Sequence, residues 1–83
     1  MVEKEVGKVT HYFSHLGVAG IILSDRLSVG DVIHILGHTT DLTLTVESIQ
    51  IGHESVAAAD AGAEIGLKVP EHVREHDVVS IVE

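Results

Sequence analysis

The apolar residues of this chain recur in short alternating runs, which is the pattern that half-buried β-strands produce. Residues 5–13 and 17–25 predict two extended segments. A turn at residues 29–31 leads into a third run, in which Ile33 and Ile35 share one face. We therefore expect the first half of the chain to consist of strands joined by tight turns.

The second half alternates too, with two interruptions. Residues 42–46 alternate strictly, but the parity shifts before Ile49, so residues 47–48 predict a β-bulge or a sharp coil. Residues 55–62 predict an irregular connection rather than a short helix, since Gly62 would end a helix before it becomes favourable.

Two further runs complete the pattern. Residues 63–69 alternate again, and residues 77–82 predict a last strand. Between them, Pro70 suits the first position of a helical turn over residues 70–76. Six or so short strands at regular spacing, joined by Gly and Asp turns, predict a small closed β-barrel.

The composition favours an all-β fold. Hydrophobic residues make up 45% of the 83 positions, and the chain has only one Tyr and one Phe. Branched aliphatic side chains suit a pleated sheet. A chain this short buries a modest core and leaves no space for a separate internal cavity. We expect residues 1–83 to form one domain.

The absence of cysteine excludes disulfides, thiolate zinc ligands and cysteine nucleophiles. No basic segment followed by an apolar run resembles a secretory signal. The longest apolar run, residues 17–23, is too short to span a bilayer. We therefore expect a cytoplasmic protein without a membrane partner.

Acidic residues dominate the charge, which is −8 at pH 7. The five basic residues are scattered along the chain: Lys4, Lys8, Arg26, Lys68 and Arg74. Because neutralising many phosphates requires a basic stripe, we expect no non-specific nucleic-acid binding. A shape-specific contact with RNA through a few side chains stays open.

Two histidine pairs have a spacing that metal ligands use, His11 with His15 and His72 with His76. On an extended strand, four residues span roughly 13 Å, which is too far for His11 and His15 to bind one ion. The second pair offers only two histidines beside carboxylates. We therefore predict no metal site and no cofactor.

Catalysis and base stacking have little support in the sequence. No G-x-S-x-G elbow or comparable context organises Ser, His and Asp, so we predict no catalytic residue and no enzyme activity. Tyr12 and Phe13 are neighbours in an expected strand and therefore point to opposite faces. We expect one of them in the core and the other exposed, rather than a platform for bases.

Residues 17–82 resemble the second domain of translation elongation GTPases of the Tu and 1-alpha type. The resemblance rests on the stretches GVAGIILSDRLSVGDVIHILG, TVESIQI and AAADAGAEIGLKV, in that order. HVREHDVV is similar to the closing element of the family, usually written with R-x-G-D. His76 stands at its Gly position, so we expect that this turn need not adopt the backbone angles that glycine allows. The resemblance implies a closed six-stranded Greek-key barrel of the translation-protein type.

The nucleotide-binding part of that family has no counterpart here, because the chain contains no G-x-x-x-x-G-K-[ST] phosphate loop. Met1 stands beside the first expected strand, so we expect a complete, stand-alone translation-factor-like protein. A similar barrel is the C-terminal domain of U32-type peptidase-family proteins, which are linked to RNA modification in translation. That family is the second possible relative.

The first resemblance also suggests a binding site, since in elongation factors this domain holds the aminoacylated end of tRNA. The Arg-Gly that is common in the family aligns with Ser14 and His15, and a frequent Glu of its pocket strand aligns with Gln50. Together with Glu64, these residues are the candidate partner- or ligand-binding positions. The replacement of basic and acidic residues by neutral ones weakens the case for a bound tRNA end.

Three functions stay open. The leading hypothesis is a non-enzymatic binding module that contacts a protein or ribonucleoprotein of the translation machinery. One alternative is an accessory domain or subunit for a separate RNA-modifying, U32-like enzyme. Another is a structural homo-oligomer.

Overall fold

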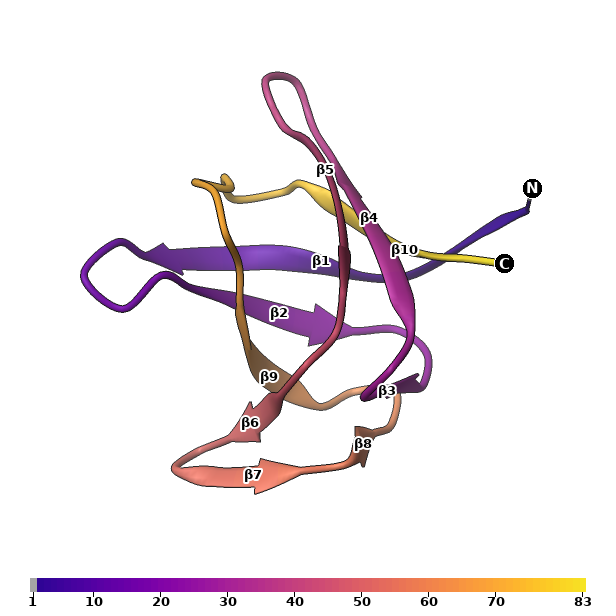
Figure 1. Ribbon diagram of the computed structural model, residues 1–83, viewed down its shortest axis with the longest axis vertical. Helices are drawn as coiled ribbons and strands as arrows, with labels where there is room; N and C mark the ends of the chain where they lie inside the picture. Colours follow the sequence, from indigo (N-terminus) through magenta and orange to yellow (C-terminus); the bar gives the residue numbers. More distant parts are fainter. Residues whose placement is uncertain (1) are drawn as a thin grey trace.

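Ten β-strands make up residues 2–83, the part of the chain that the computed structural model describes, and this part contains no helix. The strands are β1 (Glu3–Phe13), β2 (Val18–Leu23), β3 (Leu27–Ser28), β4 (Val32–Leu36), β5 (Asp41–Thr45), β6 (Ile49–Ile51), β7 (Glu54–Val56), β8 (Ala58–Ala59), β9 (Glu64–Lys68) and β10 (Val78–Val82). β4 and β5 run steeply across the direction of β1 and β2 (Figure 1). The predicted all-β class is confirmed. None of residues 2–83 belongs to a helix that could cross a membrane.

Eight strands form one antiparallel sheet in the order β5-β4-β10-β1-β2-β9-β6-β7, and β3 pairs with β8. The long strand β1 pairs with β10 along its first half and with β2 along its second half. The pairing register of β1 shifts between Glu5 and Gly7 and again between Val9 and His11, as at β-bulges. We infer that the bulges bend β1, so that it can pair with β10 in one part of the sheet and with β2 in another.

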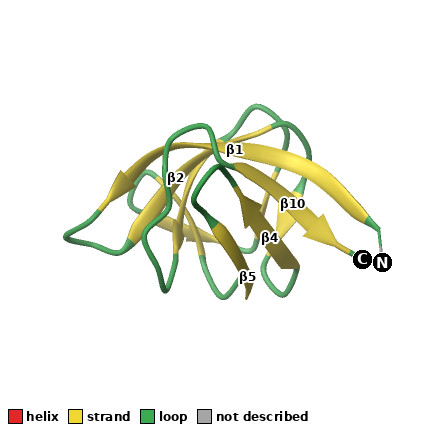
Figure 2. Cartoon of the chain, turned by 90° about the horizontal axis from the view of Figure 1, so that it is seen from above, coloured by secondary structure: helices red, strands yellow, loops and turns green. Residues whose placement is uncertain are grey.

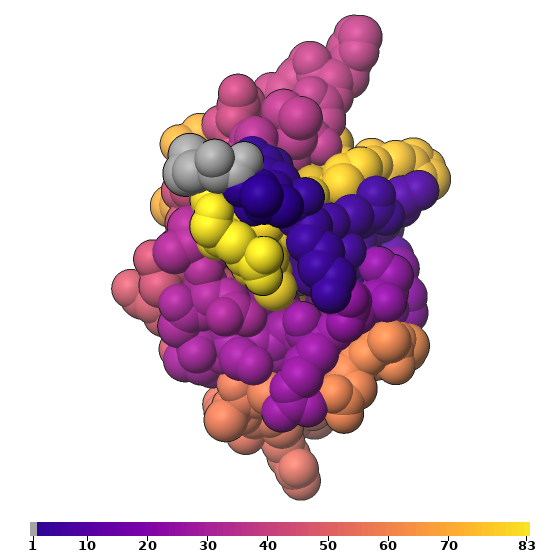
Figure 3. Space-filling view, turned by 90° about the vertical axis from the view of Figure 1, so that its right-hand side faces the viewer, coloured from indigo at the N-terminus to yellow at the C-terminus, as the bar shows by residue number. Residues whose placement is uncertain are grey.

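The two described ends of the chain lie side by side (Figures 2 and 3). Val2 and Glu83 exchange backbone hydrogen bonds of 3.3 and 2.8 Å, which extend the pairing of β1 with β10.

The strand order has two ends, β5 and β7, and no pairing between them occurs in residues 2–83. Residues 2–83 form ten strands rather than the expected six. The four additional strands are short, since β3, β6, β7 and β8 have only two or three residues each. The structure establishes an all-β sheet around one core. The closed six-stranded Greek-key barrel stays a prediction.

The core is built from branched aliphatic side chains, as the composition predicted. The largest side chains with less than 2% exposure are Ile21, Leu27, Ile33, Ile35, Ile49, Leu67, Val6, Val9, Val46, Val73 and Val79. The alternation in β4 is confirmed, because both of its isoleucines are buried while its Val and Leu residues are exposed. Complete burial of each large side chain contributes about 1.5–3 kcal/mol to the hydrophobic stabilisation.

The expected turn before β4 is also confirmed. Gly30 has a φ of +99°, which glycine adopts readily. The Asp31 N–H donates to the Ser28 carbonyl at 3.1 Å, and the Ser28 N–H donates to Asp31 Oδ2 at 2.9 Å. These two bonds close the turn.

Of the two alternatives expected for residues 47–48, a β-bulge or a sharp coil, the structure shows the coil. The chain there leaves β5, which pairs with β4, and enters β6, which pairs with β7 and β9 at the other end of the sheet. The expected helical turn over residues 70–76 was wrong, since they form bends and turns.

The expectation for His76 was wrong as well. His76 has a φ of +74°, so the turn adopts the left-handed conformation even though histidine replaces glycine there. Its N–H donates to the Val9 carbonyl at 2.8 Å, and the next residue, Asp77, is buried at 4% exposure. We infer that these tertiary contacts hold a backbone conformation that costs an ordinary residue roughly 1–2 kcal/mol.

Candidate functional site

A groove of about 510 Å³ lies on the outer face of β1, β2 and β9, where the β1–β2 and β6–β7 hairpins end. We call it the glycine groove. Its lining residues combine apolar walls with a polar rim: Thr10, His11, Phe13, Leu16, Val18, Gly20, Gln50, Gly52, His53, Glu64, Ile65 and Gly66. A concave, mostly apolar surface with few polar groups is typical of binding sites.

Two glycines form the floor of the groove. Gly20 of β2 pairs directly with Gly66 of β9, so two neighbouring outward positions lack side chains. A Cβ on Gly20 would lie 3.3 Å from Thr10 Oγ1, and a Cβ on Gly66 would lie 3.2 Å from Val18 Cγ1. Gly20 is buried beneath neighbouring side chains, whereas Gly66 is partly exposed. A ligand on the floor would therefore meet the backbone of Gly66.

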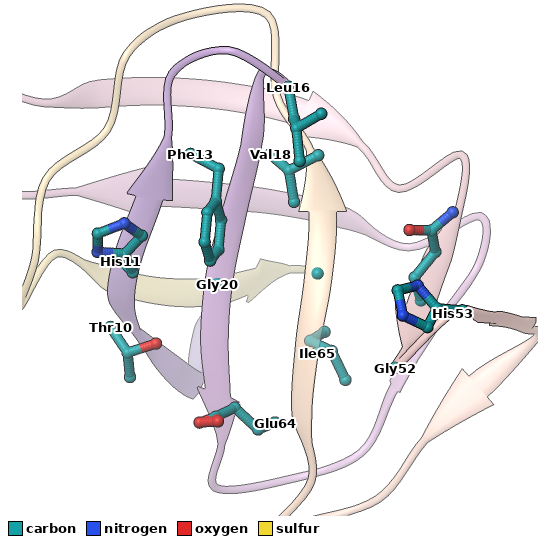
Figure 4. A pocket seen from close by; sticks show the side chains of 12 residues that line it. Thr10, His11, Phe13, Leu16, Val18, Gly20, Gly52, His53, Glu64 and Ile65 are labelled. Carbon is teal, nitrogen blue, oxygen red and sulfur yellow. The ribbon is translucent and has the colours of Figure 1, made fainter.

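Side chains of the two hairpins form the walls. Phe13 projects beside Gly20, while His53 lies beyond β9 on the opposite side (Figure 4). The Phe13 ring makes an edge contact with His11 at a centroid distance of 4.4 Å. Phe13 is 46% exposed and Leu16 is 66% exposed, so the apolar wall is open to solvent. The expected separation of the two aromatic residues is confirmed, because Tyr12 packs against the core.

The structure brings together two of the four residues proposed from the sequence. Gln50 and Glu64 line the glycine groove. Ser14 borders a different hollow, which also includes Tyr12 and His72. His15 is exposed in the β1–β2 turn and lines neither hollow. Whether these residues bind anything stays a prediction.

Sequence reasoning missed the floor and walls of the groove. One signal was available, since Gly20 and Gly66 stand at outward positions of strands where a side chain is expected. Their adjacency was not readable, because it depends on which strands pair and in which register.

Metal binding has no support from the described geometry. Among residues 2–83, no three or more His, Asp or Glu side chains lie close enough to hold one ion. His11 has Glu75 at 3.9 Å between Nδ1 and Oε1, and both side chains are more than half exposed.

His34 lies between two carboxylates outside the glycine groove. Its Nδ1 lies 2.9 Å from Glu3 Oε1, and its Nε2 lies 2.6 Å from Asp41 Oδ1. The hydrogen bond to Glu3, followed by the one to Asp41, raises the pKa of His34 above its usual value. The protonated imidazole thus joins β4 both to β5, which follows it in the sequence, and to β1, which β10 separates from β4 in the sheet.

We expect His34→Gln to cost stability in a pH-dependent manner. Because folding raises the pKa of His34, its stabilising contribution is complete below the unfolded pKa near 6.5 and is lost as pH rises through the folded value. Asp41 is 78% exposed, so the loss at pH 5.5 should be about 1 kcal/mol or less. Urea unfolding at pH 5.5 and pH 9 measures it. A difference that grows with pH would contradict the assignment.

Comparison with known proteins points to the second possible relative. No protein-family model matches the chain. Over 79 residues, which are 94% of this chain, it is 38% identical to an uncharacterized protease of Methanocaldococcus jannaschii. The chain spans only 19% of the length of that relative.

Two solved structures share the fold. One is the C-terminal domain of a Geobacillus thermoleovorans protein assigned to the U32 peptidases, with a TM-score of 0.90, 18% identity, and coverage of 96% of this chain and 93% of the domain. The other is the selenomethionine variant of that domain, with a TM-score of 0.87, 19% identity and coverage of 92% and 96%. The predicted likeness to the U32-type C-terminal domain is therefore confirmed at the level of the fold. The likeness to elongation GTPases stays a prediction.

Proposed function

We propose that this chain is a non-catalytic accessory domain or subunit that works with a separate U32-like enzyme. The observation that carries the proposal is the share of each protein that the sequence match covers. The chain matches over 94% of its own length a relative of which it spans only 19%. A solved domain of the same fold is likewise the C-terminal part of a larger protein. In this role, the glycine groove is the binding surface.

The arrangement of polar side chains supports a binding role over a catalytic one. Nowhere in residues 2–83 does a serine or threonine hydroxyl hydrogen-bond to a histidine, as a nucleophile and its base would. The closest contacts of a histidine with carboxylates are those of His34, on β4 and outside the groove. The His34 side chain links β4 to β1 and β5, and it does not line the glycine groove.

The test is affinity capture of the tagged chain from the cells that produce it, followed by mass spectrometry. We expect recovery of a separate U32-like catalytic chain in stoichiometric amount, and no peptide hydrolysis by the isolated chain. Recovery of ribosomal proteins and tRNA would favour the translation-factor role instead. A salt-insensitive dimer without another partner would favour the structural oligomer. Either of these two results would contradict the proposal.

The translation-factor role and the closed Greek-key barrel rest on the sequence resemblance alone. The names of the relatives point to peptide chemistry, since one is described as a protease and the other as a peptidase. The partner that we propose is still the U32-like, RNA-modifying enzyme that the sequence resemblance implies.

A further inference from the structure

We propose that the glycine groove binds an extended peptide segment in which a basic, an apolar and an acidic side chain occupy every second position. The inference rests on the proposed accessory function and deepens it, because it names the chemistry of what the groove holds.

The glycine groove continues along β9 into a second hollow of about 200 Å³. The two hollows share Leu16, Val18, Gln50 and Gly66. The first reaches Glu64 and the second reaches Lys68. The joined channel therefore follows the outer face of β9 from one end of that strand to the other.

Opposite charges stand at the two ends of the channel. Glu64 and Lys68 are both exposed, and within residues 2–83 neither side chain has an ion pair or a side-chain hydrogen bond. At a rise of about 3.3 Å per residue, their Cα atoms lie roughly 13 Å apart. A bound chain with a cation at one end and a carboxylate at the other would pair with both.

The centre of the channel suits an apolar side chain. Gly66 lies midway between the two charged residues and is partly exposed, so the floor there is backbone without a side chain. The exposed side chains of Phe13 and Leu16 stand beside it. Side chains of an extended peptide point to the same side at every second residue. Positions i, i+2 and i+4 therefore reach Glu64, the floor and Lys68 together.

Charge favours a peptide over RNA and over a second copy of the chain. The net charge of −8 repels a phosphate backbone, and among residues 2–83 Lys68 is the one lysine or arginine that lines the two hollows. A second copy carries the same net charge, so association of two copies also brings like charges together.

The experiment is a titration of the ¹⁵N-labelled chain, followed by NMR, in 0.15 M salt. The probe is a capped peptide with the core Lys-Gly-Leu-Gly-Glu. We expect chemical-shift changes confined to the groove, and at least about tenfold weaker binding when the central Leu becomes Gly. A single-stranded RNA of similar length should cause no such change.

Variants of the groove test each contact separately. Gly66→Val places a side chain on the floor while Val suits a strand, so we expect binding to weaken about tenfold in a folded protein. Gly66→Ala is the milder second variant.

Glu64→Lys should shift the preference to a peptide with Glu at both ends, and Lys68→Glu to one with Lys at both ends. Glu71→Lys, outside the two hollows, changes the charge equally and should alter affinity less than twofold.

Several results would overturn the inference: no peptide binding at millimolar concentration, tighter binding of RNA, groove shifts caused by self-association, or unchanged affinity in the groove variants. The two proposals fail separately. Capture of the enzyme chain without peptide binding overturns only this inference. Peptide binding without an enzyme partner overturns only the accessory role.

Discussion

Replacing Gly37 by alanine should lower the free energy of unfolding by about 3 kcal/mol. An added Cβ at this position would overlap the carboxylate of Asp77. Asp77 is only 4% exposed, and its Oδ2 accepts a hydrogen bond of 2.9 Å from the Arg74 N–H. Because this carboxylate is short and already bonded, it cannot move aside without losing its partner and disturbing the turn before β10.

Urea unfolding followed by circular dichroism measures the loss. Gly66→Ala is the matched control, because the one tight contact of its Cβ would be with a side-chain methyl at 3.2 Å, and we expect a change within about 0.5 kcal/mol. The double variant Gly37→Ala with Asp77→Ala removes the overlap, so it should be less destabilised than the sum of the single variants. A loss below 1 kcal/mol for Gly37→Ala would show that the turn adapts.

Gly7→Ala should cost about 2–3 kcal/mol for a different reason. The added Cβ would lie 2.6 Å from the Ile22 carbonyl oxygen and 3.0 Å from Ile21 Cγ2. The first contact is with backbone, and Gly7 pairs with both β2 and β10 at a register shift of β1. Relief therefore requires two pairs of strands to move apart.

Thermal unfolding is a suitable measurement for Gly7→Ala. At 4–8 °C per kcal/mol for a domain of this size, the melting temperature should fall by roughly 10–20 °C. The control is Thr10→Ala on the same strand, where an exposed side chain is truncated and the expected change is within about 0.5 kcal/mol. An unchanged melting temperature for Gly7→Ala would mean that β1 can shift as a unit.

Part of the candidate site was predictable from the sequence and part was not. Gln50 and Glu64 were proposed from a resemblance, and both line the glycine groove. Ser14 and His15 were proposed on the same basis, but the β1–β2 turn directs them elsewhere. A resemblance transfers a position along a strand more reliably than a position in a turn, because hydrogen bonds hold the strand register while turn conformation depends on local residues.

The amino-acid sequence by itself determined the strand character of this protein, the parity of its buried positions and the aliphatic nature of its core. These properties follow from the two-residue period of a strand and from the preferences of individual residues, both of which are local. The turn at Gly30 belongs to the same class, because three consecutive residues specify it.

The tertiary structure alone decided which strands pair, and therefore which distant residues meet. Gly20 meets Gly66, His34 meets Glu3, and Asp77 fills the space beside Gly37 only because of strand order and register. The separation of β5 from β6 and the left-handed conformation of His76 have the same origin. In each case the stabilising contact joins residues far apart in the sequence, so no local pattern records it.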